Sequence, residues 1–119
     1  MPKNIKLNYV EFPAKDLPAT KKFFKDAFRW SFTDYGNDYT AFSDAGLEGG
    51  FYTSDLTSLA SKGAALLVLL TDDLARTQST VEACGGKIST PIFAFPGGRR
   101  FHFIEPSGNE FAVWCFSAE

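Results

Sequence analysis

The stretch Tyr9-Val10-Glu11-Phe12-Pro13-Ala14-Lys15-Asp16-Leu17 places a short alternating segment directly before a helix start. Val10 and Phe12 fall on the same face of an extended segment, which predicts a core face. Asp16 is a residue type that accepts hydrogen bonds from the unpaired N–H groups of a helix start. The stretch therefore predicts a strand over 7–13 that leads into a helix ending at about Phe28.

The same order of elements occurs again in the second half of the chain. The continuous apolar run 64–71 predicts a strand covered on both faces. Asp72-Asp73 then predicts the start of a helix that ends at about Cys84. Asp16-Leu17 matches Asp73-Leu74 at an offset of 57 residues, which indicates an internal repeat.

Turn residues divide the rest of the chain into short strands and one linker. Tyr39 and Phe42 match Phe101 and Ile104 at an offset of 62, so the second half carries an insertion of five residues. The linker 54–63 has room for a short helical turn, and Pro91 predicts an irregular or edge strand. The remaining predicted strands are 30–35, 39–43, 47–53, 87–95, 99–105 and 110–116.

The element order βαβββ, repeated once, predicts an α+β fold of two modules. We expect one domain over residues 1–119, with half-repeats at about 5–53 and 64–117. A chain of 119 residues with 45% hydrophobic and 16% aromatic residues has enough apolar surface for a packed core.

Composition argues against several classes of function. The net charge of −2, without a basic stripe, argues against nucleic-acid binding. The first eight residues lack an apolar signal-peptide segment, and no apolar run approaches the ~20 residues of a membrane helix. Cys84 and Cys115 belong to no CxxC pattern, which predicts reduced thiols. We therefore expect a cytoplasmic protein.

Four segments are informative because they occur in a fixed order. They are the opening stretch, Phe23-Phe24 followed by Ala27-Phe28-Arg29-Trp30, Gly85-Gly86-Lys87, and Phe103-Ile104-Glu105-Pro106-Ser107-Gly108-Asn109-Glu110-Phe111. In this order the chain resembles the vicinal oxygen chelate superfamily, which includes glyoxalase I, bleomycin-resistance proteins, fosfomycin-resistance enzymes and extradiol dioxygenases. Glu105 stands where the late family segment usually has Asp. The resemblance implies paired βαβββ modules that form an incomplete barrel-like sheet with an open cleft.

The resemblance also implies a divalent metal held by the first and last strand of each half. The offsets place these four positions at Tyr9, Gly50, Leu66 and Ala112. Leu, Gly and Ala side chains have no donor atom, and a single Tyr does not make a site. His102 is the only histidine, so a site with two histidines from one chain is impossible. We expect no metal and no other cofactor.

Strand alternation predicts which side chains line the cleft. His102 is included because its neighbours Phe101 and Phe103 are expected in the core. The predicted ligand-binding residues are Tyr9, Glu11, Glu48, Gly50, Tyr52, Leu66, Val68, His102, Ala112 and Trp114.

Each of these residues also has an ordinary structural interpretation. Tyr9 and Trp114 can pack without a ligand. Glu11, Glu48 and His102 are the weak catalytic candidates, and for each an ordinary surface position is the favoured interpretation. Arg99-Arg100 is either solvated or attracts an anion.

Together with the resemblance, the sequence favours a metal-free protein that binds a flat or amphipathic organic molecule in an aromatic cleft. The resemblance also implies a homodimer. Two alternatives stay open. One is an enzyme, either a glyoxalase-like lyase or isomerase with an atypical metal site or a metal-free acid–base catalyst. The other is a degenerate structural or interaction module.

Overall fold

Each half of the chain folds into a four-stranded sheet with one helix packed on it. The computed structural model describes residues 4–116. The first half contains β1 (Tyr9–Ala14), α1 (Leu17–Phe28), β2 (Ser31–Asp34), β3 (Tyr39–Ser43) and β4 (Glu48–Thr53). The second contains η1 (Ala60–Lys62), β5 (Leu67–Leu70), α2 (Leu74–Ala83), β6 (Lys87–Phe95), β7 (Gly98–Ile104) and β8 (Glu110–Phe116). The predicted α+β fold of two βαβββ modules is confirmed.

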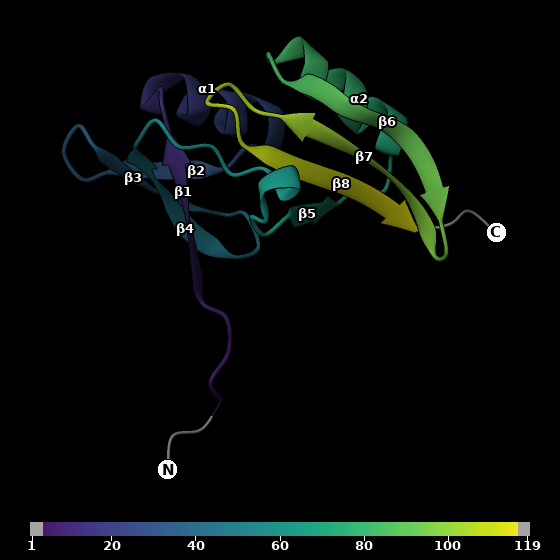
Figure 1. The fold of residues 1–119 in the computed structure, drawn as a ribbon, viewed down its shortest axis with the longest axis horizontal. Helices are drawn as coiled ribbons and strands as arrows, with labels where there is room; N and C mark the ends of the chain where they lie inside the picture. The colour runs from purple at the N-terminus through teal and green to yellow at the C-terminus, as the bar shows by residue number, and fades with distance from the viewer. Residues whose placement is uncertain (1–3, 117–119) are drawn as a thin grey trace.

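The two sheets have the same strand order. The N-sheet runs β1-β4-β3-β2 and the C-sheet runs β5-β8-β7-β6. Figure 1 shows the two sheets side by side with both helices along the upper edge. Within residues 4–116 the strands form no closed barrel and no helix is long and apolar enough to cross a membrane.

Helix starts form where the sequence predicts them. The Asp16 carboxylate accepts a hydrogen bond from the Ala19 N–H at 3.0 Å, and the Asp73 carboxylate accepts one from the Arg76 N–H at 3.1 Å. These two caps satisfy N–H groups that a helix start leaves unpaired.

The register of the parallel strand pair in each module reproduces both offsets. Glu11 lies opposite Gly50 in the parallel pair β1–β4, and Val68 lies opposite Ala112 in the parallel pair β5–β8. These pairs differ by 57 residues on the first strand and 62 on the second. The five-residue insertion therefore lies between the helix and the last strand of the second module.

The offset between β3 and β7 was predicted wrongly by one residue. Tyr39 lies opposite Tyr52, whereas Arg100 lies opposite Trp114. Since Tyr52 and Trp114 correspond at the offset of 62, Tyr39 corresponds to Arg100 at an offset of 61. The predicted match between Tyr39 and Phe101 places the two residues on opposite faces.

The core residues show the consequence of this one-residue error in the offset. Phe42 corresponds to Phe103, not to Ile104, and both phenylalanines are buried. A shift of one residue along a strand exchanges its core face for its other face. Phe103 and Ile104 are both hydrophobic, so hydrophobicity alone did not show which of them corresponds to Phe42.

Aromatic side chains join the two modules into one core. The Phe111 ring of the C-sheet lies 5.0 Å from Phe12 in β1 and 5.1 Å from Phe24 in α1. The Phe103 ring lies 5.6 Å from Phe23 in α1. All five rings are almost completely buried, so the helix of the first module packs against strands of the second.

A buried polar network also crosses between the modules, in the segment between β7 and β8. The Glu105 carboxylate accepts hydrogen bonds from Thr20 Oγ1 at 2.7 Å, the Ser107 N–H at 3.1 Å and Asn109 Nδ2 at 2.8 Å. Asn109 Nδ2 also donates to the Pro13 carbonyl at 2.7 Å. Burial raises the pKa of Glu105, and these donors act in the opposite direction.

Two predicted strands are shorter in the structure. β1 begins at Tyr9, and residues 4–8 project from the body with Ile5 and Leu7 exposed (Figure 1). β5 covers only Leu67–Leu70, not 64–71. The expectation that both faces of this strand are covered was wrong, because Val68 is 43% exposed and Leu70 is 58% exposed. The predicted half-repeat boundary at 117 lies outside the described residues.

β6 is irregular, as Pro91 predicted. It forms the outer strand of the C-sheet, and its register with β7 shifts between Ile88 and Thr90 and again between Thr90 and Phe93. A proline on an outer strand leaves no ladder hydrogen bond unmade.

Candidate functional site

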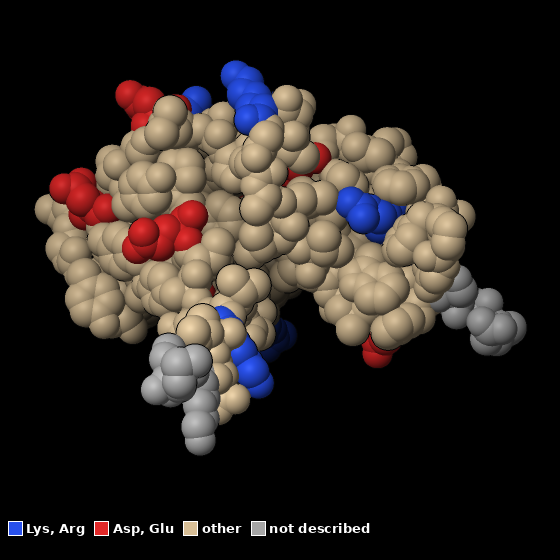
Figure 2. Space-filling view, turned by 60° about the horizontal axis from the view of Figure 1, so that its bottom comes forward, with Lys and Arg blue, Asp and Glu red and all other residues tan. Residues whose placement is uncertain are grey.

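Each sheet has one face against the helices and one face turned away from them, which we call its open face. Figure 2 brings the side opposite the helices forward and shows a hollow between the projecting N-terminal segment and the lobe that carries the C-sheet. Most of this side is tan, with few charged side chains. The charged groups that do lie on the open faces therefore determine what these faces can recognise.

Two tyrosines and a glutamate form a hydrogen-bonded group on the open face of the N-sheet. The Tyr39 hydroxyl lies 2.6 Å from the Tyr9 hydroxyl and donates to the Glu11 carboxylate at 2.8 Å. Burial raises the pKa of Tyr39, and the hydrogen bonds to Tyr9 and Glu11 raise it further. The phenol therefore stays protonated and acts as a fixed donor to Glu11.

Gly50 lies beneath the Tyr39 ring. A Cβ atom at position 50 would overlap the Tyr39 hydroxyl and ring carbons, so only glycine leaves room for this tyrosine. Glu48 and Tyr52, two residues to either side on β4, share the open face and are exposed. The predicted cleft residues of the first half thus lie together on one surface, with Gly50 as its covered floor.

A chain of three polar side chains crosses the open face of the C-sheet. Arg100 Nε and Nη2 lie 3.1 and 2.8 Å from His102 Nε2, and His102 Nδ1 lies 2.9 Å from the Glu110 carboxylate. Because the guanidinium only donates, Nε2 must accept, so the imidazole proton lies on Nδ1 and is donated to Glu110. The Ala60 N–H donates to the other Glu110 oxygen at 3.0 Å.

The electrostatics of Glu110 follow from these contacts. Partial burial raises its pKa, but the hydrogen bonds from His102 and from the Ala60 N–H outweigh burial and hold the pKa below its ordinary value. Glu110 is therefore ionised at neutral pH, and each of its carboxylate oxygens accepts a hydrogen bond from this chain.

Aromatic side chains surround the polar chain. The Arg100 guanidinium carbon lies 5.7 Å from the Phe93 ring centre and 5.9 Å from the Phe95 ring centre. The Phe95 ring lies 6.0 Å from Trp114, which in turn lies 4.5 Å from Phe116. Phe116 is 67% exposed and Phe93 is 38% exposed. This face thus combines a positioned cation with exposed aromatic surface.

The other predicted residues of the second half lie on or beside the same face. His102 lies opposite Ala112, which lies opposite Val68, so these three form one row across β7, β8 and β5. Ala112 is completely buried and contributes no exposed surface. Leu66 precedes β5 and is half-buried.

The four positions that the family resemblance assigns to a metal do not fit one. Gly50 is covered by Tyr39, Ala112 is completely buried, and neither has a donor atom. Within residues 4–116 no group of three His, Cys, Asp or Glu side chains is arranged to hold a metal ion. On the N-sheet, the hydrogen-bonded group of Tyr9, Tyr39 and Glu11 occupies the region that the resemblance assigns to metal ligands.

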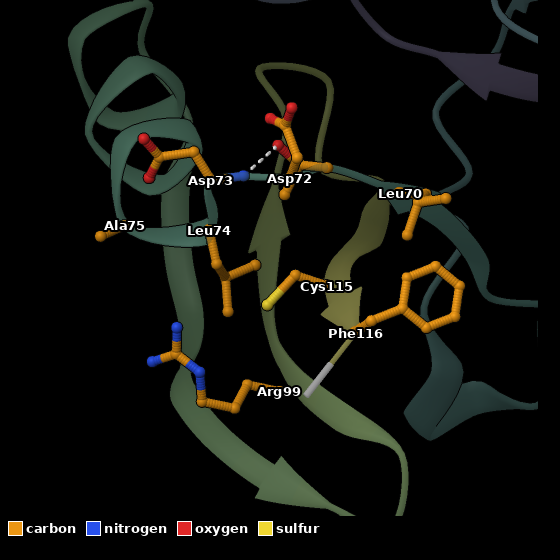
Figure 3. A pocket seen from close by; sticks show the side chains of 9 residues that line it. Leu70, Asp72, Asp73, Leu74, Ala75, Arg99, Cys115 and Phe116 are labelled. Atoms are coloured by element: carbon orange, nitrogen blue, oxygen red, sulfur yellow. Dashed lines mark hydrogen bonds between the residues drawn. The ribbon is translucent and has the colours of Figure 1, made fainter. Parts of the chain in front are cut away.

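A cavity of about 770 Å³ lies where β5 leads into α2 (Figure 3). Its residues include Asp72, Asp73, Arg99 and Cys115, together with Leu70 and Phe116. Cys115 is a free thiol that is 8% exposed. Arg99 extends into this cavity, whereas the next residue, Arg100, lies on the open face. The predicted pair Arg99-Arg100 therefore divides between two surfaces.

Sequence reasoning missed several residues of the open faces. Tyr39 was not predicted there because the β3–β7 offset was wrong by one residue. Phe93 and Phe95 were missed because Pro91 obscured the alternation of β6. Glu110 is the counterpart of Glu48 at the offset of 62, and this match was the signal that could have identified it.

The fold and the empty ligand positions define a paired-βαβββ protein without the usual metal-binding side chains. A family model for the Glyoxalase/Bleomycin resistance protein/Dioxygenase superfamily matches residues 6–113, and the chain belongs to this superfamily. No curated protein matches the chain in sequence.

Solved structures support the same fold. A glyoxalase-related enzyme from Fulvimarina pelagi is 16% identical with a TM-score of 0.78, covering 94% of this chain and 88% of that one. A glyoxalase/bleomycin resistance protein/dioxygenase family enzyme from Burkholderia phytofirmans PsJN is 14% identical with a TM-score of 0.78, covering 94% and 99%. TnmS3, an antibiotic binding protein from Streptomyces sp. CB03234, is 18% identical with a TM-score of 0.70, covering 98% and 100%.

Proposed function

We propose that this protein binds a flat or amphipathic organic molecule on its open faces without a metal. The observation that carries the proposal is the C-sheet face, where Arg100 is held over Phe93 and Phe95 beside exposed apolar side chains. Exposed aromatic surface with a few positioned polar groups is the usual composition of a small-molecule site. The described antibiotic-binding relative is compatible with such a role in this fold.

Homodimerisation is part of the proposal. Ile5 and Leu7 are 82% and 90% exposed on a segment that projects from the body, and Leu70 and Phe116 are exposed on the C-sheet. Exposed apolar side chains of this kind favour contact with a second copy of the chain. The partner would then cover part of the open faces and narrow the hollow into a cleft.

A cytoplasmic location is also proposed. Cys84 and Cys115 are both free, which suits a reducing compartment.

Thermal-shift screening with planar aromatic compounds tests the binding proposal, because a ligand at 100 times its Kd stabilises the fold by about 2.7 kcal/mol. Trp114 on the open face gives a second readout, and Trp114→Phe is the control because the other tryptophan, Trp30, is buried. We expect ligand-induced quenching in the native protein and its loss in the variant. Failure of every planar compound to stabilise the protein would contradict the proposal.

Elemental analysis tests the metal-free part of the proposal separately. We expect less than stoichiometric Zn, Ni, Mn and Fe in purified protein. The metal-free proposal would be contradicted if the purified protein held a stoichiometric metal and if removing that metal with a chelator abolished ligand binding.

Acid–base catalysis by His102 is the second candidate function. The observation that favours it is the hydrogen bond from Nδ1 to Glu110, which orients an imidazole in the manner of a general base. It is less well supported because Arg100 donors occupy Nε2, the atom that would take a proton. A reaction lost in His102→Gln but retained in Trp114→Phe would favour the enzyme over the binding protein.

A further inference from the structure

We propose that the ligand of the open face is an aromatic carboxylate, and that Arg100 is the residue that selects it. This inference rests on the proposed small-molecule binding and specifies the chemistry of the same site. Four observations carry it: the fixed orientation of Arg100, its unused donors, the absence of a competing carboxylate, and the apolar surroundings.

Arg100 is held in one orientation by its neighbours. Its Nε and Nη2 both point at His102 Nε2, and the guanidinium lies over the Phe93 and Phe95 rings. His102 is itself fixed by Glu110. A guanidinium fixed in this way loses little rotational freedom when a ligand binds, so His102 acts as a positioning residue for Arg100.

The guanidinium keeps donors for a further partner. Arginine has five N–H groups, and the contacts with His102 account for two of them. In the described part of the chain, Arg100 forms no ion pair with a carboxylate. Glu110, the acidic residue on this face, is turned to His102 Nδ1 and the Ala60 N–H.

The surroundings favour a planar anion over other ligands. A carboxylate pairs with the planar fork of a guanidinium through two parallel hydrogen bonds. The attached ring would pack against Phe93, which is 38% exposed beside Arg100, or against Trp114, which lies opposite Arg100 on β8. A cationic ligand is repelled by Arg100, and a neutral one leaves donors unpaired as the face loses water.

Arg99 provides a matched control for Arg100. The two residues are adjacent in β7 and have the same charge, but Arg99 lines the cavity beside α2. Arg99→Gln therefore changes net charge by the same amount as Arg100→Gln, at a side chain that points to the opposite side of β7. Any general effect of charge on ligand attraction appears in both variants.

The experiment compares 2-naphthoate with its neutral counterpart 2-naphthamide by calorimetry and by Trp114 fluorescence. In the native protein and in Arg99→Gln we expect naphthoate to bind at least about tenfold more tightly than naphthamide. In Arg100→Gln we expect this preference to disappear, with the affinity for naphthamide retained. Arg100→Lys, which keeps the charge but loses the planar fork, should retain only part of the preference.

The outcomes separate this inference from the function on which it rests. Equal binding of both probes by the native protein overturns the carboxylate inference and leaves small-molecule binding intact. A naphthoate preference that survives in folded Arg100→Gln overturns the role of Arg100. Binding of neither probe overturns both. The comparison in the native protein decides the ligand class even if Arg100→Gln does not fold.

Discussion

The Tyr39 hydroxyl occupies the space that a side chain at Gly50 would need, and this places a phenol on the N-sheet where the family resemblance predicts a metal ligand. Tyr39 reaches this position from the neighbouring strand, since β3 pairs with β4. The open face of the N-sheet is thus organised by a hydrogen-bonded group rather than by a cation.

Gly50→Ala should lower the free energy of unfolding by about 1–3 kcal/mol, because the added methyl displaces Tyr39 and its hydrogen bonds to Tyr9 and Glu11. The same substitution in a Tyr39→Ala background should cost clearly less. Chemical denaturation of the four proteins of this double-mutant cycle measures the coupling. Equal costs in both backgrounds would show that Gly50 is required for another reason.

Asn109→Ala should destabilise the protein by about 1–3 kcal/mol. The substitution removes the donor to the buried Pro13 carbonyl and to Glu105, and also the acceptor of the Ser58 N–H at 2.8 Å. Asn37→Ala, in an exposed turn, is the control and should change stability by less than about 0.5 kcal/mol. Both variants are measured by urea unfolding. A similar loss of unfolding free energy in the two would contradict the role of Asn109 in joining the modules.

Glu110 should contribute to acid sensitivity. Its pKa is lowered in the folded protein, so the folded state binds fewer protons than the unfolded state just below pH 4.5, the ordinary value. Its stabilising contribution is present above that pH and is lost as the pH falls through the lowered pKa. The unfolding free energy of Glu110→Gln should therefore fall less steeply with decreasing pH.

Glu48→Gln is the matched control for the acid experiment, because Glu48 is the exposed counterpart of Glu110 in the first module. This variant reports the effect of removing one carboxylate charge from an open face. Superimposable profiles for the native protein and Glu110→Gln would refute the assignment.

Ile5→Asp and Leu7→Asp should weaken self-association, since both side chains are apolar and exposed on the projecting segment. Analytical ultracentrifugation should show a dimer for the native protein and a larger monomer fraction for the variants. Lys6→Asp is the control for a charge in the same segment. A native protein that sediments as a monomer would refute the proposed dimer.

The sequence predicted most of the fold because hydrophobic alternation and cap residues act locally. Asp16 and Asp73 begin their helices as predicted, and the predicted bounds of the strands at 39–43 and 110–116 agree with the structure. The site was less predictable because it depends on pairing between strands. The approach of Tyr39 to Gly50 joins β3 to β4, and the contact of His102 with Glu110 joins β7 to β8, so neither follows from a residue's own segment.

The apolar run 64–71, which contains β5, shows a further limit of local reasoning. This run was expected to be covered on both faces, yet Leu70 and Val68, which was also predicted to line the cleft, are exposed on the open face. Hydrophobicity predicts that a side chain avoids water, but it does not specify whether its own chain, a ligand or a second copy covers it.

Strand β7 separates folding from recognition along a single segment. Phe101 and Phe103 are completely buried, while Arg100 and His102, which alternate with them, lie on the open face. Substitutions at the second pair can therefore alter which molecule is recognised without disturbing the hydrophobic packing. A duplicated scaffold of this kind can acquire new binding preferences through single changes at alternate positions, at little cost to its ability to fold.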